Sequence, residues 1–334
     1  LLGQPSAATA SPPQKPGGDT NIDALIKSIV GTTDAVAPEP AGQAGLLAAV
    51  DMELTTRLQT ILHDSAFQAL EAAWRSLDWL VRRCPDEERV TFQVLDVALD
   101  ELEADLAGLH HLLRDEPPDL LVGNYTFGNG PTDLRILGGL AQLCAAVNAS
   151  FLGAAAPCLV GGDSFAVHPD PDDWQSPASA ETEEAWQSLR ALPDSAHVGL
   201  ALPRFLLRQP YGTASDPIDS LGFEELPDPA AHDALLWGNS AFLCAHLLAD
   251  AFAIEGDAMT TAGGGDVDDI PVFTYLQDGE SAAKPCAEAW LVDRAADAIR
   301  RCGLIPCQSI KGRDAVHVAG LQSISASGSA LAGW

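Results

Sequence analysis

The spacing of apolar residues between positions 46 and 83 predicts two consecutive amphipathic helices. In residues 46–63, aliphatic residues recur every three or four positions, at Leu47, Val50, Leu54, Leu58 and Ile61. The next stretch, "SAFQALEAAWRSLDWLVRR" (residues 65–83), repeats that spacing at Phe67, Leu70, Trp74, Leu77 and Val81. We expect this second apolar stripe to be a buried helix face in the core of a first α/β unit.

Two tryptophans on the second helix point in different directions, because Trp79 lies five positions after Trp74, about 140° around the helix. One interpretation is a core helix that touches two neighbours within one domain. The other is that one tryptophan packs in the core and the second lies at a contact between chains. A large apolar side chain left in water beside Arg82 and Arg83 usually marks a contact. We therefore expect Trp74 to be structural and Trp79 to be an interface residue.

Strand-like runs and helical periods alternate along the rest of the chain. The segment "RVTFQVLDVAL" (residues 89–99) alternates Val90, Phe92 and Val94 and therefore predicts a strand. Further strands are predicted at 119–125, 150–157, 197–212 and 286–292, and helices near 102–113, 134–148, 181–191, 232–252 and 293–303. A Gly-containing turn predicts a terminal hairpin from 304–310 and 315–324. This alternation favours an α/β fold with mixed sheets flanked by helices, divided into units at 46–158 and 159–334.

The first 45 residues have a different composition. Residues 1–20, "LLGQPSAATASPPQKPGGDT", are rich in Pro, Gly, Ser and Ala and cannot bury enough surface to order on their own. A short helix is predicted at 21–30, with Asn21 as its cap, before "GTTDAVAPEPAG" interrupts the pattern again. We therefore expect a flexible, extended N-terminal arm, residues 1–45, whose apolar contact residues are Ile22, Leu25, Ile26 and Ile29.

The net charge of the chain argues against some classes of binding partner. The chain has 334 residues, is 47% hydrophobic and carries a formal net charge of −29. Such a field repels nucleic acid and anionic membranes and favours partners with a positive face, although an acidic proteome would give the same composition. No apolar run is long enough to span a bilayer. The seven cysteines are scattered and form no CxxC pair, which is typical of free thiols in a reducing, cytoplasmic protein.

No stretch of the sequence carries a recognisable catalytic or metal-binding pattern. "GNYTFGNGP" lacks the GK[ST] ending of a phosphate-binding loop, and "GGDSF" lacks the second glycine of a nucleophile elbow. The histidines have no metal-ligand spacing, and "GDVDDI" is only part of a calcium-loop pattern. We therefore expect no cofactor, no metal and no enzymatic activity.

Two arginines lie in an apolar run of a chain that is short of cations. In "PRFLLRQPYG", Arg204 and Arg208 need carboxylate partners if they are buried, and Glu224 and Glu225 are candidates. The alternative is an anion site formed by both arginines, and we favour the structural ion pair. Trp237, in "LLWGNSAFLC", is also expected to be structural.

Several stretches, taken together and in order, resemble the large subunit of the type VI secretion contractile sheath. They are "ILHDSAFQALEAAWRSLDWLV", "LPRFLLRQPYG", "LLWGNSAFLCAHLLADAFA" and "KPCAEAWLVDRAADAIRRCGLIPCQSIKGRDAVHVAGLQSI". The "IDALIKSIV" and "LLAAVDMELTTRLQ" segments also fit that family. The resemblance implies a sheath-subunit-like fold and a structural role. In that family the large subunit pairs with a small sheath subunit, and the pairs stack into a helical tube around an inner tube.

The resemblance also implies partners and one departure. Neighbouring family members are linked by strands donated from chain termini, so copies of the chain itself are expected partners, with inner-tube or baseplate proteins as further candidates. Family members continue past the "LQSI" region, whereas this sequence ends at Trp334, so we expect weaker lateral linkage. The alternatives are a sheath-derived accessory or capping protein that builds no long tube, and an acidic α/β enzyme.

Overall fold

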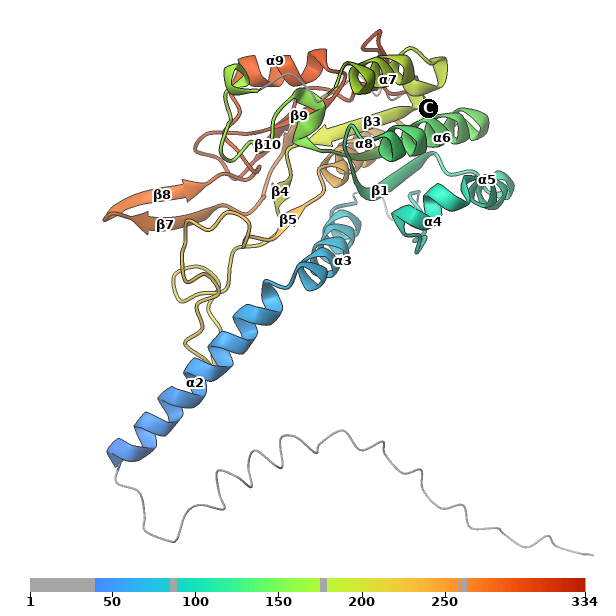
Figure 1. Ribbon diagram of the computed structural model, residues 1–334. Coiled ribbons are helices and arrows are strands. Elements are labelled where there is room, and N and C mark those ends of the chain that lie inside the picture. Colours follow the sequence, from blue (N-terminus) through green and yellow to red (C-terminus); the bar gives the residue numbers. More distant parts are fainter. Residues whose placement is uncertain (1–39, 85–88, 175–178, 257–258, 260–262, 334) are drawn as a thin grey trace, which may run out of the picture. The chain divides into compact units, whose positions relative to one another are not determined.

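A computed structural model (Figure 1) describes residues 40–84, 89–174, 179–256, 259 and 263–333. The predicted arm residues Ile22, Leu25, Ile26 and Ile29 lie outside these ranges. The chain divides into two compact units, Leu1–Glu53 and Leu54–Trp334. The first unit contributes the beginning of helix α2 (Pro40–Leu62), and the remaining helices and strands belong to the second.

One six-stranded mixed sheet organises the second unit. Its strands lie in the order β1 (Leu120–Phe127), β2 (Ser150–Ala155), β3 (Val198–Leu202), β9 (Ile305–Ser309), β10 (Val316–Val318) and β6 (Gly265–Val267). The first four strands are parallel, and β10 runs antiparallel to both of its neighbours. The predicted α/β class with mixed sheets and the predicted terminal hairpin are confirmed.

The sheet also corrects the predicted division of the chain. Residues 158 and 159 fall between β2 and β3, which are hydrogen-bonded neighbours, with Phe151 opposite Val198. The two predicted units therefore share one sheet and one pair of cores, and the boundary between them is wrong. Sequence periodicity finds strands, but it does not tell which strands pair across a long crossover.

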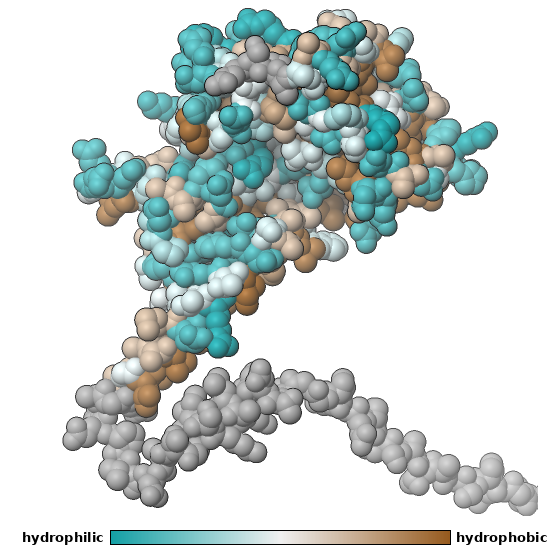
Figure 2. Space-filling model, in the orientation of Figure 1, coloured by the Kyte–Doolittle hydropathy of each residue, from teal (hydrophilic) through white to brown (hydrophobic). Residues whose placement is uncertain are grey.

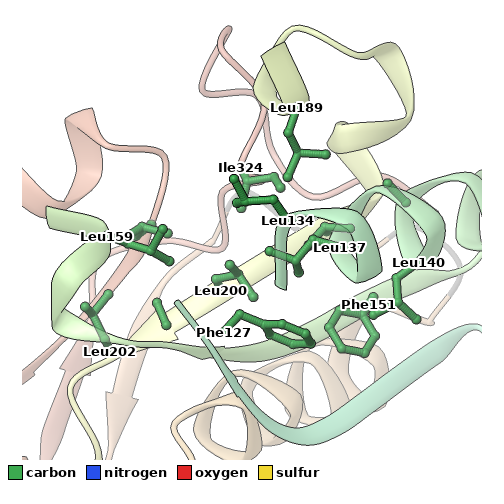
Figure 3. Close-up of a cluster of buried hydrophobic side chains, with 14 of the residues drawn as sticks. Phe127, Leu134, Leu137, Leu140, Phe151, Leu159, Leu189, Leu200, Leu202 and Ile324 are labelled. Atoms are coloured by element: carbon green, nitrogen blue, oxygen red, sulfur yellow. The ribbon is translucent and has the colours of Figure 1, made fainter. Parts of the chain in front are cut away.

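Successive side chains of the strands fill two cores on opposite faces of the sheet. Phe151 packs in one core (Figure 3) beneath helices α6 (Pro131–Val147), α7 (Ala180–Arg190) and α9 (Asp293–Arg301). Its neighbour Leu152 packs in the other, beneath α8 (Ala241–Glu255) and α3 (Ser65–Arg83). Short helices α4 (Leu99–Ala104) and α5 (Leu106–Asp115) lie beside the first core, with Leu102 and Leu113 buried in it.

Smaller elements lie outside the main sheet. Strands β4 (Phe205–Leu206) and β5 (Trp237–Gly238) pair with each other, and β7 (Phe273–Gln277) and β8 (Glu280–Lys284) form a hairpin. The hairpin turn is tight because Asp278 and Gly279 both adopt positive φ. Three 3₁₀ turns complete the described elements: η1 (Pro157–Val160), η2 (Pro171–Asp173) and η3 (Pro193–His197).

Four local predictions differ from the structure. Residues 89–99 form no strand, and residues 286–292 contribute only a single bridge, between Ala287 and Phe205. The helix predicted at 232–252 begins only at Ala241, because Trp237 and Gly238 pair with β4. The helix predicted around 102–113 is broken at Asp105, whose side chain accepts a hydrogen bond from the Gly108 amide and caps α5.

Candidate interaction surface on helix α3

The apolar stripe of α3 faces away from the body of the second unit. Phe67, Leu70, Trp74 and Val81 are 38%, 57%, 63% and 39% exposed, and Leu77 is half-buried. The prediction that Trp74 belongs to the core is therefore wrong. The helix itself is formed as predicted, and the Asp64 carboxylate caps it by accepting hydrogen bonds from the Ala66 and Phe67 amides at 3.1 and 3.0 Å.

The opposite side of α3 packs onto the protein and contains Trp79. The Trp79 ring lies 5.4 Å from the ring of Phe205 and 5.3 Å from that of His246, and the Arg83 guanidinium lies 4.9 Å over it. Leu80 and Ser76 beside it are buried. Trp79 is half-buried against these neighbours and therefore packs within the chain, the role predicted for Trp74, while its predicted contact with another chain stays a prediction.

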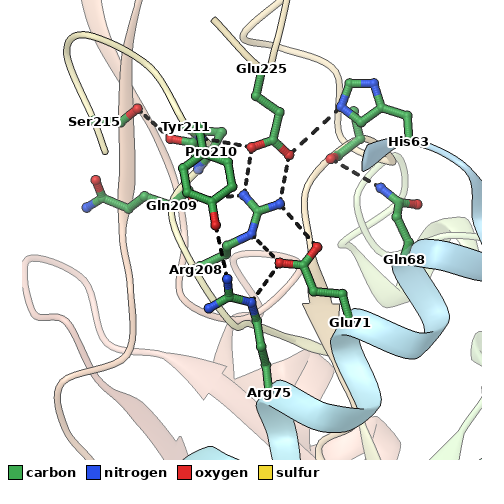
Figure 4. Close-up of polar contacts among 11 residues, drawn as sticks. His63, Gln68, Glu71, Arg75, Arg208, Gln209, Pro210, Tyr211, Ser215 and Glu225 are labelled. Atoms are coloured by element: carbon green, nitrogen blue, oxygen red, sulfur yellow. Dashed lines mark hydrogen bonds and ion pairs between the residues drawn. The ribbon is translucent and has the colours of Figure 1, made fainter. Parts of the chain in front are cut away.

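Polar residues of α3 are turned inward because they meet a buried cation. Arg208, only 8% exposed at its side chain, donates through Nη1 to Glu225 Oε2 at 2.6 Å and through Nε to Glu71 Oε1 at 2.9 Å (Figure 4). The predicted pairing with Glu225 is present, and the sequence missed Glu71, which lies 137 positions away on α3. Glu224 takes a different role and accepts a hydrogen bond from the Thr213 amide at 3.0 Å.

Electrostatics hold this network in its charged form. Burial by itself raises the pKa of Glu71, but the hydrogen bonds and charges of Arg208 and Arg75 outweigh it and place that pKa below its usual value. Burial likewise opposes the charge on Arg208, yet its two carboxylate partners raise its pKa. Arg75 also donates to the Tyr211 hydroxyl at 3.1 Å, so α3 is tied to the loop after β4 at two points.

The second predicted arginine belongs to a separate cluster. Arg204 is half-exposed and donates through Nε to Glu288 Oε2 at 3.1 Å, while His232 Nε2 lies 3.3 Å from Glu288 Oε1. Burial raises the pKa of Glu288, but His232 and Arg204 outweigh it and lower that pKa to about 2. The two arginines thus bind different carboxylates and form no common anion site. Trp237 is buried nearby, and its indole nitrogen donates to the His232 carbonyl at 3.0 Å.

Four buried polar atoms of the described residues have no hydrogen-bond partner, three where α3 packs on α8 and one at the end of α2. Within the described residues, these are Ser76 Oγ, Trp79 Nε1 and His246 Nδ1 at the α3–α8 contact, together with His63 Nε2 at the end of α2. His246 is buried, and that burial lowers its pKa. The inner face of α3 is thus more polar than its outer face, which is the reverse of an ordinary surface helix.

Exposed apolar side chains also follow α2 in Figure 2, where hydrophobic patches interrupt the hydrophilic colouring. The exposed members include Leu47, Val50, Leu54 and Ile61. Leu58 is half-buried, so the predicted stripe of α2 is mostly accessible to solvent.

Possible ligand sites are few in the part of the chain that the structure describes. No group of three or more His, Cys, Asp or Glu side chains could hold a metal ion there. A shallow depression of about 540 Å³ is lined by Gln209, Ser215, Asp216, Asp269 and Asp314, among others, and the Ser215 hydroxyl donates to the Pro210 carbonyl at 2.6 Å rather than to a base. Among the described residues, no helix combines the length and apolarity that crossing a bilayer requires.

Comparison with known proteins identifies the group to which this architecture belongs. The model of the family VipB, described as "EvpB/VC_A0108, tail sheath N-terminal domain", matches residues 44–115 and 113–325. The type VI secretion system sheath protein TssC1 of Pseudomonas aeruginosa is 32% identical over 301 residues, which cover 84% of this chain. The chain spans 60% of the length of that relative. Because the family model matches most of its length, the chain belongs to the VipB family of tail sheath proteins.

Proposed function

We propose that the chain is a structural subunit of a contractile, sheath-like assembly of the type VI secretion system. In this role it pairs with a small sheath subunit, and the pairs stack with further copies around an inner tube. Membership of the tail sheath family and the similarity to TssC1 support this role. Contacts with the inner tube and the baseplate belong to the same proposal. No specific observation favours the accessory or capping alternative.

The observation that carries the proposal is the outward apolar face of α3. Four large side chains, including Trp74 at 63% exposure, stand in water along four turns of one helix. Contiguous apolar surface of this kind marks a contact with another chain, since leaving it in water costs free energy that burial would recover. We assign this face to the small sheath subunit.

The ion network beneath α3 serves the same role by fixing which face is presented. Arg208 holds Glu71 on the inner side of the helix, and Arg75 binds both Glu71 and Tyr211. Rotating α3 to bury its apolar stripe would leave these charges unpaired in the interior, which is costly. A rigid, preorganised face loses less conformational entropy on binding than a mobile one.

The assembly is assigned to the cytoplasm. All seven cysteines are free and five of them are buried, which agrees with a reducing compartment.

Co-purification with a purified small sheath subunit of the type VI secretion system tests the proposal. Trp74→Asp places a charge at the centre of the apolar face, and we expect it to abolish co-purification while the isolated subunit stays folded. Leu276→Asp is the matched control, because Leu276 is 74% exposed but lies on β7, away from α3. Equal retention of the partner by both variants would show that α3 is not the pairing surface. Negative-stain imaging of the wild-type pair tests for tubular assemblies.

A further inference from the structure

Residues 90–96 have the sequence of a β-strand but no sheet to join. Val90, Phe92 and Val94 alternate with polar residues, and β-branched and aromatic residues favour strands. In the structure the segment is neither helix nor strand. Within the described residues, its backbone amides and carbonyls make no hydrogen bond to another backbone group. Phe92 and Val94 on the apolar side of the segment are 37% and 64% exposed, and Leu95 on the other side is 42% exposed, so neither side is covered.

Both ends of this segment are anchored to the body of the protein. At its start, the Arg89 guanidinium lies 4.5 Å from the Phe252 ring and donates to the Phe252 carbonyl at 3.4 Å, near the end of α8. Beyond its end, the Tyr125 hydroxyl of β1 donates to the Val97 carbonyl at 2.6 Å. The residues between these anchors therefore present free backbone groups from a defined place on the surface.

We infer that residues 90–95 pair as a strand with an extended segment of the small sheath subunit, the partner that also covers α3. This inference rests on the proposed function above. An extended segment whose backbone N–H and C=O groups lack partners within the chain is a usual site for an added strand. The added strand forms hydrogen bonds to it at every second residue. The alternating side chains Phe92 and Val94 then face the same apolar layer of the partner.

Two observations favour that occupant over a second copy of this chain. First, α3 packs on α8, and residue 89 is anchored at the end of the same α8, so the two uncovered surfaces flank one helix. A single partner with a helix and a neighbouring strand covers both. Second, each copy carries a net charge of −29, which disfavours pairing of residues 90–95 with a second copy relative to a different chain, and the stacking of further copies uses other surfaces.

A proline scan tests strand pairing directly. Proline removes one backbone N–H, and in an added strand only alternate N–H groups face the partner. We expect Thr91→Pro, Phe92→Pro, Gln93→Pro and Val94→Pro to leave the melting temperature of the isolated subunit within a few degrees of wild type. Affinity for the purified small sheath subunit should fall about tenfold at one parity only, at 91 and 93 or at 92 and 94. Phe92→Ala and Val94→Ala serve as controls for the lost side chains.

Equal effects at all four positions, or no effect beyond that of the alanine controls, would overturn the inference. Should a proline variant fail to fold, amide exchange resolved to single residues in the wild-type pair gives the same answer, since alternate amides of 90–95 should become protected on binding. Protection in the isolated chain, together with a dimer in analytical ultracentrifugation, would show that a second copy occupies the segment and would also overturn it.

The Trp74→Asp variant distinguishes failure of the α3 pairing surface from failure of the strand pairing at residues 90–95. Loss of partner binding in Trp74→Asp with no parity effect in the proline scan leaves the proposed function standing and removes only the strand pairing. Retention of binding by Trp74→Asp removes the assignment of α3 itself.

Discussion

Replacing Arg208 by methionine removes the cation that two carboxylates of the protein interior share. The side chains of Glu71 and Glu225 are only 12% and 2% exposed, so neither gains much hydration when the guanidinium is lost. Breaking a buried ion pair by removing one partner typically costs about 3–5 kcal/mol. Glu71 keeps Arg75 and Glu225 keeps the Tyr211 amide at 2.8 Å, so we expect a loss of about 3 kcal/mol in the free energy of unfolding.

The loss of unfolding free energy in Arg208→Met should become smaller at low pH. In the wild type the pKa of Glu71 lies below its ordinary value of 4.5, so its stabilising contribution is complete above that pH. The contribution is lost as the pH falls through the lowered folded-state value. In Arg208→Met the unpaired Glu71 carboxylate becomes tolerable in the interior once it is protonated. The deficit of the variant relative to wild type is therefore largest at pH 7 and shrinks as the pH falls below 4.5.

Urea unfolding followed by circular dichroism at pH 7 and at pH 4 measures both quantities. The matched control is Arg82→Met, which removes an ion pair with Asp78 on the exposed side of the same helix and should leave stability unchanged at either pH. A deficit below about 1 kcal/mol at pH 7, or one that grows at pH 4, would refute the view that Arg208 neutralises buried charge. A specific anion-binding signal lost in the variant would point to the alternative that the sequence left open.

Three further outcomes follow from the same contacts. Trp79→Ala should cost about 3 kcal/mol of folding stability because the ring packs against Phe205 and His246, whereas Trp74→Ala should leave the unfolding midpoint in urea nearly unchanged. The pKa of His246 is lowered by burial, so wild-type stability should fall as the pH drops below 6.5, and His246→Gln should flatten that slope. Glu288→Gln should destabilise the chain by roughly 2–3 kcal/mol at neutral pH, and this deficit should disappear as the pH falls from 4.5 towards 2.

Elements defined by their own local sequence could be predicted well. Helices α6 and α7 lie within three residues of the ranges expected from apolar spacing, and the β9–β10 hairpin lies where a glycine-containing turn indicated it. Elements that depend on distant partners could not. Trp237 and Gly238 extend an apparently continuous helical pattern, yet they form a strand because Phe205 and Leu206 offer backbone groups beside them. Arg208 was visible as a cation in need of a carboxylate, but the position of Glu71 depends on how α3 docks.

Helix α3 illustrates a limit of a different kind. Its periodicity identifies an apolar face correctly, but periodicity does not say whether the partner of that face lies in the same chain. In a monomer that partner has to lie in the same chain, since an uncovered apolar stripe is unfavourable. In a subunit of an assembly the apolar face can be covered by another chain. The polar side of the helix then determines how the helix packs within its own chain. Here Glu71 and Arg75 meet Arg208 and Tyr211, and Trp79 fills the remaining apolar gap against Phe205. The inward side of α3 carries Glu71 and Arg75, and its outward side carries Phe67, Leu70 and Trp74, which is the arrangement expected of a helix that meets a second chain, as proposed above.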